Sequence, residues 1–302
     1  MRSPDTQSDA VTIESSELAA IVKTKGAELC SLRPHGGEER LWQADPAVWP
    51  WHAPNLFPIV GALADDTLVH RGERYPMPSH GFLRHSMTTV VDQSFSSVRL
   101  QLVDSPETRV RYPFPFGLTI EFRVDADRLR QSFEVANPGD EPLLVSLGAH
   151  PAFAWPLLAK GITRTAHIVQ FAGNELQPIR RATAGGLSSA SYPTPLQDGR
   201  VLPLDDSLFE PGAIIWDRVE RRAVTFGVPD GPAIEMEFAD FPHFALWTKP
   251  GAGFLCLEPW QGHVSPLGFR GELALKPGIV EIAPGGSRSW SLTIRPISLW
   301  AL

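Results

Sequence analysis

Apolar and polar residues alternate with a period of two over several stretches of this chain. Between residues 117 and 125, every second residue from Leu118 to Val124 is apolar, and most of those between are polar or charged. The same alternation recurs in residues 97–104, 129–137 and 289–297. This pattern is typical of antiparallel strands with one face in the core and the other in water. It favours an all-β chain.

Turn-forming residues separate these runs, and the 29 prolines and 25 glycines suit many short strands joined by loops. Helical patterns are brief. Asp45 followed by Pro46 predicts a helix start, but Pro50 ends it within about one turn. Residues 205–212 predict another single turn. Residues 173–200 are polar and turn-rich, which predicts a long surface excursion.

No repeat or long linker divides the chain. We therefore predict a frayed tail over residues 1–10 and a single all-β domain over residues 11–302. A chain of 302 residues with 43% hydrophobic residues is long enough for one large core.

Charge and composition narrow the classes of partner. The net charge of −7 argues against nucleic acid or an anionic membrane as a partner. No run of about eighteen apolar residues predicts a transmembrane helix, and the polar N-terminus lacks a signal-peptide core. Cys30 and Cys256 lie far apart in apolar settings, so we expect two free thiols and a cytoplasmic location.

Three short segments carry candidate chemistry, and two of them are built around a histidine. His80 precedes Gly81, where the backbone requires an unusual conformation or a close approach. His150 lies in an apolar run and precedes Pro151, which favours extended backbone. Taken singly, His80 is better explained as a loop histidine, and His150 slightly better as a neutral core histidine.

The third segment, residues 253–263, places a carboxylate on an apolar strand. Glu258 shares a strand face with Phe254 and Cys256, and Pro259 is expected to end or bend the strand. A carboxylate there is costly unless it is paired or used. A structural interpretation is a salt bridge to Arg84 or Arg270.

Taken together, Glu258, His150 and His80 can supply one base and one acid. Trp247 and Trp260 add flat apolar surfaces, and aromatic rings beside polar groups suit the two faces of a sugar. Metal-ligand motifs, a nucleophile elbow and nucleotide-binding glycine loops are all lacking. We therefore predict no metal and no cofactor.

In order along the chain, the segments resemble the aldose 1-epimerases (mutarotases), and in particular their LacX-like bacterial branch. The stretches that carry the resemblance are GAELCSL (26–32), LWQADPAVW (41–49), APNLFPIVG (53–61), SHGFLRH (79–85), YPFPF (112–116), SLGAHPAF (146–153), LWTKPGAGFLCLEPWQGH (246–263) and GELALKPG (271–278). They cover almost the whole chain. The resemblance implies an antiparallel β-supersandwich with a sugar cleft on one concave sheet.

The resemblance also implies roles for individual residues. Glu258 matches the family's base, His150 its acid, and His80 a histidine that holds and polarises the sugar. Arg84 matches an arginine near the substrate of related sugar-phosphate mutarotases, and Asp206 is the candidate for an aspartate that binds sugar hydroxyls. The implied partner is a small-molecule sugar, a hexose or related aldose, acted on by a monomer or homodimer.

The sequence departs from the pattern at two positions. Members of this branch often carry an arginine just after LFPIVG, where this chain has Ala62, and an aspartate after the EPW motif, where it has Ser265. Two other functions stay open. One is a sugar-binding or sensing protein without catalysis. The other is a glycoside hydrolase or lyase, where hydrolysis normally needs a second carboxylate across the cleft from Glu258.

Overall fold

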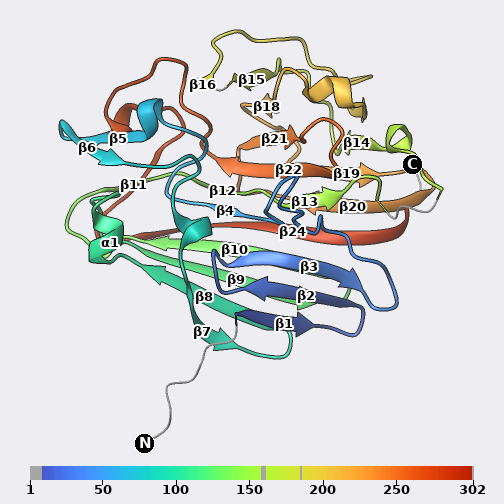
Figure 1. Cartoon of the computed structure of the whole chain (residues 1–302), viewed down its shortest axis with the longest axis horizontal. Coiled ribbons are helices and arrows are strands. Elements are labelled where there is room, and N and C mark those ends of the chain that lie inside the picture. Colours follow the sequence, from blue (N-terminus) through green and yellow to red (C-terminus); the bar gives the residue numbers. More distant parts are fainter. Residues whose placement is uncertain (1–8, 158–160, 184–185, 301–302) are drawn as a thin grey trace, which may run out of the picture.

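The computed structural model describes residues 9–157, 161–183 and 186–300. Two large antiparallel sheets are stacked on one another, with a smaller three-stranded sheet beside them (Figure 1). Every pair of named strands in the described residues is antiparallel, so the prediction of an all-β supersandwich is confirmed. The predicted tail lies largely in residues 1–8, outside the described residues, and the first strand already begins at Ala10. A single domain over residues 11–302 stays a prediction.

The larger sheet has nine strands. In spatial order they are β17 (Val201–Pro203), β14 (Ile168–Phe171), β19 (Ala223–Gly227), β20 (Gly231–Glu237), β24 (Ser287–Trp300), β10 (Arg128–Ala136), β9 (Gly117–Asp125), β8 (Ser97–Val103) and β7 (Thr89–Gln93). The second sheet has eight strands: β16 (Gly186–Leu187), β15 (Arg180–Thr183), β18 (Ile214–Trp216), β21 (His243–Trp247), β22 (Phe254–Gln261), β12 (Leu147–Ala149) and β4 (Asn55–Leu56), with β13 (Ala152–Ala154) also paired to β22.

Smaller elements complete the described residues. The three-stranded sheet holds β1 (Ala10–Glu14), β2 (Leu18–Lys23) and β3 (Glu28–Pro34), and two strand pairs are β5 (Thr67–His70) with β6 (Glu73–Pro76) and β11 (Leu143–Val145) with β23 (Val280–Ile282). The helix α1 (Pro106–Arg109) is one turn long, and the 3-10 turns are η1 (Ala64–Asp66), η2 (Leu83–His85), η3 (Arg164–Ala166), η4 (Asp206–Phe209) and η5 (Leu273–Leu275). No helix in the described part of the chain has the length and hydropathy to cross a membrane.

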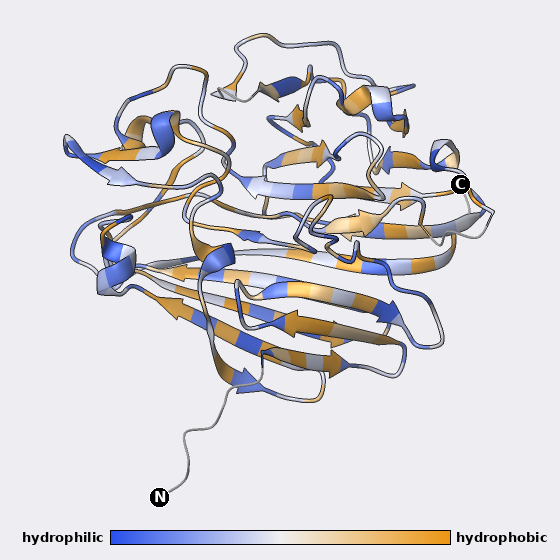
Figure 2. Ribbon diagram, viewed as in Figure 1, coloured by the Kyte–Doolittle hydropathy of each residue, from blue (hydrophilic) through white to orange (hydrophobic). Residues whose placement is uncertain are grey.

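The period-two pattern is confirmed in three dimensions. Along β9, Leu118, Ile120, Phe122 and Val124 are buried in the main core, and the residues between them are more exposed. Figure 2 shows the resulting alternation of apolar and polar bands along the strands of the large sheets. The core between the sheets forms because each sheet turns one such apolar face inward.

β22 is buried on both faces, and the face turned away from the main core carries the candidate site. Its residues Leu255 and Leu257 pack into the main core. The opposite face carries Phe254 and Cys256 in a second apolar cluster and Trp260 in a third. Glu258 projects from that second face, as the alternation predicts, and is 1% exposed.

Pro259 does not end this strand, contrary to the sequence-based expectation. β22 continues through it to Gln261. Leu257 donates its N–H to Pro151 O at 3.1 Å, at the interruption between β12 and β13. In an antiparallel ladder, backbone groups of residues two apart point the same way, so the nitrogen of Pro259 faces the same side, where the pairing of β12 with β22 ends at Gly148.

Two other local predictions have different outcomes. Asp45 starts a single turn, in which Trp49 N donates to Asp45 O at 2.8 Å, and η4 is the expected turn within residues 205–212. The surface excursion over residues 173–200 is wrong in part. Its segment contains β15 and β16, which pair at the edge of the second sheet, and Leu187 is fully buried in an apolar cluster with Ile215 and Ala245. Both cysteines are free thiols, as predicted.

Candidate active site

A cavity of about 260 Å³ opens on the face of the second sheet that carries Glu258. Its lining residues fall into three kinds. Polar side chains are His80, Arg84, His150 and Glu258; aromatic ones are Trp49, Trp247 and Trp260; the remainder are Ala182, Gly212, Ala213, Ile215 and Val264. Six of the seven residues proposed from the sequence therefore meet at one cavity.

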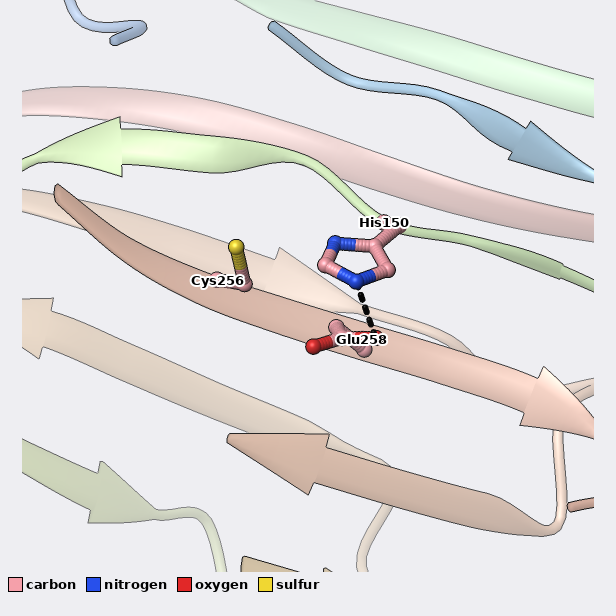
Figure 3. Close-up of side chains that lie close together, drawn as sticks. All are labelled: His150, Cys256 and Glu258. Carbon is pink, nitrogen blue, oxygen red and sulfur yellow. Dashed lines mark ion pairs between the residues drawn. The ribbon is translucent and has the colours of Figure 1, made fainter. Parts of the chain in front are cut away.

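Glu258 and His150 face each other across neighbouring strands. β12 and β13 both pair with β22, and the register is the same on either side of the gap between them. This register puts His150 directly opposite Glu258, and opposed residues project from one face of a sheet. His150 Nε2 lies 3.0 Å from Glu258 Oε2 (Figure 3). The partner of Glu258 is thus His150. Arg270, one of the two arginines considered from the sequence, pairs instead with Asp65.

Burial shapes the protonation of this pair. Removal from water raises the pKa of Glu258 well above its usual value. The nearby indole N–H of Trp260 acts in the opposite direction, although it forms no hydrogen bond. Burial also lowers the pKa of His150 well below its usual value, with smaller contributions from His80 and Arg84. Both shifts disfavour an isolated charge. The pair is therefore expected to hold one proton between its two members over a broad pH range.

His80 is fixed by a tight backbone turn. Its φ is +64°, and its N–H donates to Gly61 O at 2.8 Å. Gly81 follows with φ of +72°, and a Cβ there would lie 2.1 Å from Phe57 O, so both reasons for a glycine expected from the sequence hold. Gly61 N donates to His80 Nδ1 at 3.2 Å, and we therefore assign the ring proton to Nε2.

This neutral form of His80 is also favoured electrostatically. Burial, together with the charge of Arg84, lowers the pKa of His80 to about 3. The imidazole stands next to His150, with ring centroids 5.7 Å apart. A neutral ring with Nε2–H can donate a hydrogen bond to a ligand without adding charge to the pair.

Tryptophan rings enclose the acid–base pair. Trp49 stacks on the His150 ring with centroids 5.2 Å apart, and Trp247 meets the same ring edge-on at 5.9 Å. Trp49 was not proposed from the sequence as a site residue, although it ends the matching stretch LWQADPAVW. Ala182, Ala213, Ile215 and Val264 were missed because no residue-type signal marks small apolar side chains as cavity lining.

Arg84 and Asp206 have different outcomes. Arg84 lines the cavity, donates from Nη2 to Ser79 O at 2.9 Å, and lies 5.3 Å over the Trp51 ring. Asp206 lies outside the cavity lining. It pairs with Arg164 at 2.6 Å and accepts from Gly251 N at 3.1 Å, so its carboxylate is engaged in holding a loop.

Unpaired polar atoms gather at the cavity. Among the described residues, the buried side-chain atoms without a hydrogen-bond partner include Arg84 Nε, His150 Nδ1 and Trp260 Nε1, all from lining residues. Leaving such atoms unpaired costs free energy, about 1–3 kcal/mol each. Their concentration at one place offers hydrogen bonds to a polar ligand.

His150, Cys256 and Glu258 are the group of described residues that could hold a metal ion. One nitrogen, one sulfur and one oxygen lie within 4.8 Å of one another, and Figure 3 shows Cys256 on the same side of β22 as Glu258. Metal ligation requires a thiolate and a carboxylate. Burial raises the pKa of both Cys256 and Glu258 well above their usual values, which opposes that state. The residues present fit an acid–base pair better than a metal centre.

The two departures from the family pattern are neighbours in space. Ser265 N donates to Ala62 O at 3.4 Å. Ser265 is buried, and its hydroxyl has no partner among the described residues. Neither position lines the cavity.

Comparison with known proteins defines the class to which this fold and site belong. The aldose 1-epimerase family matches residues 9–278, so the chain belongs to that family. It is 32% identical over 296 residues to the plasmid-encoded protein LacX of Lactococcus lactis subsp. lactis, covering 94% of this chain and 99% of LacX.

Solved structures show the same fold. A galactose mutarotase related enzyme from Lactobacillus acidophilus has a TM-score of 0.88 at 26% identity, covering 96% of this chain and 97% of that one. A galactose mutarotase-like protein from Lactobacillus casei also reaches 0.88, at 27% identity, covering 95% and 100%.

Proposed function

We propose that this protein interconverts the α and β anomers of an aldose. The observation that carries the proposal is the His150–Glu258 pair, 3.0 Å apart and buried at a cavity lined by three tryptophans. Anomer exchange removes a proton from the C1 hydroxyl and delivers one to the ring oxygen. A pair that holds one proton can do both without a net change in its protonation.

In the proposed mechanism Glu258 is the base and His150 the acid. In the form of the pair in which the shared proton lies on His150, the carboxylate of Glu258 takes the C1 hydroxyl proton while the imidazolium of His150 protonates the ring oxygen. The C1–O5 bond breaks, the aldehyde turns about C1–C2, and the ring closes on its other face. The two residues then exchange roles. No electron is transferred and no group leaves.

Neighbouring side chains support these steps. His80 Nε2–H and Arg84 are proposed to hold substrate oxygens, and both stand at the polar end of the cavity. Trp247 and Trp260 are proposed to contact the apolar face of the sugar ring. The tryptophans around His150 exclude water, which would otherwise compete for the proton.

The test is anomer-exchange NMR on a panel of free and phosphorylated hexoses and pentoses. Wild-type protein is expected to accelerate exchange of at least one sugar, and Glu258→Gln to lose about 100-fold or more of kcat. Glu107→Gln, at a fully exposed carboxylate, is the matched control and should keep the wild-type rate. If Glu258→Gln keeps the wild-type acceleration, the assignment of Glu258 as the base is wrong.

Two other functions make distinct forecasts. A sensing protein, consistent with Ala62 in place of the arginine, would bind sugars without accelerating exchange. A hydrolase would release reducing ends from oligosaccharides. Hydrolysis normally uses two carboxylates, and Glu258 is the one carboxylate among the described lining residues, which favours epimerisation.

A further inference from the structure

Hydrogen-bonding side chains are concentrated at one end of the cavity. His80, Arg84, His150 and Glu258 stand together there. The rest of the described lining consists of tryptophan rings and small or aliphatic residues. Apart from indole N–H groups, no side chain in this second set can form a hydrogen bond, and none offers an acceptor.

The sheet register leads directly from the polar end to the apolar one. Glu258 on β22 is paired with Ala245 on β21, and Ala245 is paired with Ile215 on β18. Paired residues project from one face, and neighbouring strands lie ~4.8 Å apart. Ile215 therefore stands ~10 Å from Glu258 on the same face, with only the methyl group of Ala245 between them.

The cavity lining around Ile215 packs against further apolar side chains. Ile215 and Ala245 belong to a buried cluster with Leu56, Val60 and Leu187. Ala182, Ala213 and Val264 pack against that cluster and also line the cavity. The register also places Arg180 of β15 beside Ile215. Its guanidinium already donates to Asp217 Oδ2 at 3.1 Å and to Ser188 O at 2.6 Å, so it is engaged within the protein.

This division has a consequence for the sugar. With C1 at His150 and Glu258, the substituents remote from C1 extend over Ala245 toward Ile215. A hydroxyl group there gives up water and gains no side-chain acceptor, whereas a methyl or methylene group buries apolar surface.

We propose that the preferred substrate of this site is a deoxyaldose, with a methyl or methylene group in place of a hydroxyl-bearing carbon at the end remote from C1. The inference rests on the proposed anomer exchange and adds the substrate class. The polar side chains are expected to bind the C1 hydroxyl and the ring oxygen. The apolar lining around Ile215 is expected to favour the deoxy end of the sugar.

Matched sugar pairs test the preference. Exchange would be measured by NMR for D-galactose against 6-deoxy-D-galactose, D-glucose against 6-deoxy-D-glucose, and D-glucose against 4-deoxy-D-glucose. At least one deoxy sugar is expected to show a kcat/KM about tenfold above its parent. Equal or lower values in all three pairs would overturn this proposal, while exchange of the parent sugars would leave the proposed function standing. If no sugar is accelerated, both fail.

Two variants at Ala213 separate the effect of a hydrogen-bonding group in the apolar lining from the effect of side-chain size. Ala213→Ser adds a hydroxyl to the apolar wall, and Ala213→Cys adds similar bulk with a much weaker hydrogen-bonding group. The serine variant is expected to narrow the deoxy preference about threefold or more, and the cysteine variant to retain it. An identical preference in both variants would overturn the role of the wall.

Discussion

His150 and Glu258 lie directly opposite each other on neighbouring strands, with Nε2 and Oε2 3.0 Å apart. His150 occupies the interruption between β12 and β13, and Glu258 lies at the matching position of β22. The regular strand pairing on either side fixes both backbones. The proposed acid and the proposed base are therefore held by the sheet itself, which is more rigid than a pair of loops.

The pair is expected to act as one unit. His150→Asn and Glu258→Gln should each lower kcat about 100-fold or more, because each leaves the other without a proton partner. The double variant should be scarcely slower than the slower single variant. Polarimetry on freshly dissolved α-sugar measures all three. Losses that simply multiply would show that the two residues act independently.

Gly81 should be intolerant of any side chain. Gly81→Ala places a Cβ 2.1 Å from Phe57 O at a φ of +72°, so the turn that carries His80 must shift. We expect a loss of about 3 kcal/mol or more in unfolding free energy, together with reduced activity. Gly72→Ala is the matched control, with φ of +79° and open space around it, and should cost only about 1 kcal/mol. Urea unfolding compares the two, and equal losses would contradict the steric argument.

His80 should make the fold sensitive to acid. Its pKa falls from an ordinary 6.5 to about 3 in the folded protein, so the unfolded chain binds the proton first. The resulting stability is present above pH 6.5 and is lost as pH falls from 6.5 toward 3. Between pH 6.5 and 5 the contribution lost is ~1–2 kcal/mol. Unfolding curves of wild type and His80→Gln at both pH values test this, and an unchanged slope in the variant would contradict it.

Asp206 is expected to stabilise a loop and to have no direct role in sugar binding. Its carboxylate pairs with Arg164, and the Asp206 side chain is 41% exposed. Asp206→Asn should therefore leave KM within about twofold and lower the unfolding free energy by about 0–1 kcal/mol. A tenfold rise in KM with unchanged stability would instead restore Asp206 to the sugar site.

Metal removal should not affect the reaction. Cys256 is the third member of the group with His150 and Glu258, but burial raises the pKa of its thiol. Dialysis against EDTA is expected to leave kcat unchanged, and Cys256→Ala to keep it within about fivefold at a cost of about 1 kcal/mol in stability. Loss of activity on chelation, restored by Zn²⁺, would identify a metal enzyme.

Some features could be predicted from the sequence because they depend on local chemistry. Period-two alternation predicts strands such as β9, since a strand turns successive side chains to opposite faces. Gly81 marks a left-handed turn because a side chain would clash there. The order of short motifs indicates the family, and with it the cavity residues His80, His150 and Glu258.

The tertiary structure decided which distant residues meet. Strand pairing opposes His150 to Glu258, and no local pattern specifies a pairing between residues so far apart in the sequence. Pro259 remains inside β22 because its nitrogen lies on the side where the pairing with β12 ends at Gly148. Asp206, a candidate by residue type, is held instead by Arg164, while Ile215 and Ala213 become cavity walls through the fold of the second sheet. The sequence determined the chemical groups and the strand faces, whereas long-range packing determined their partners, because only packing brings separate strands onto one surface.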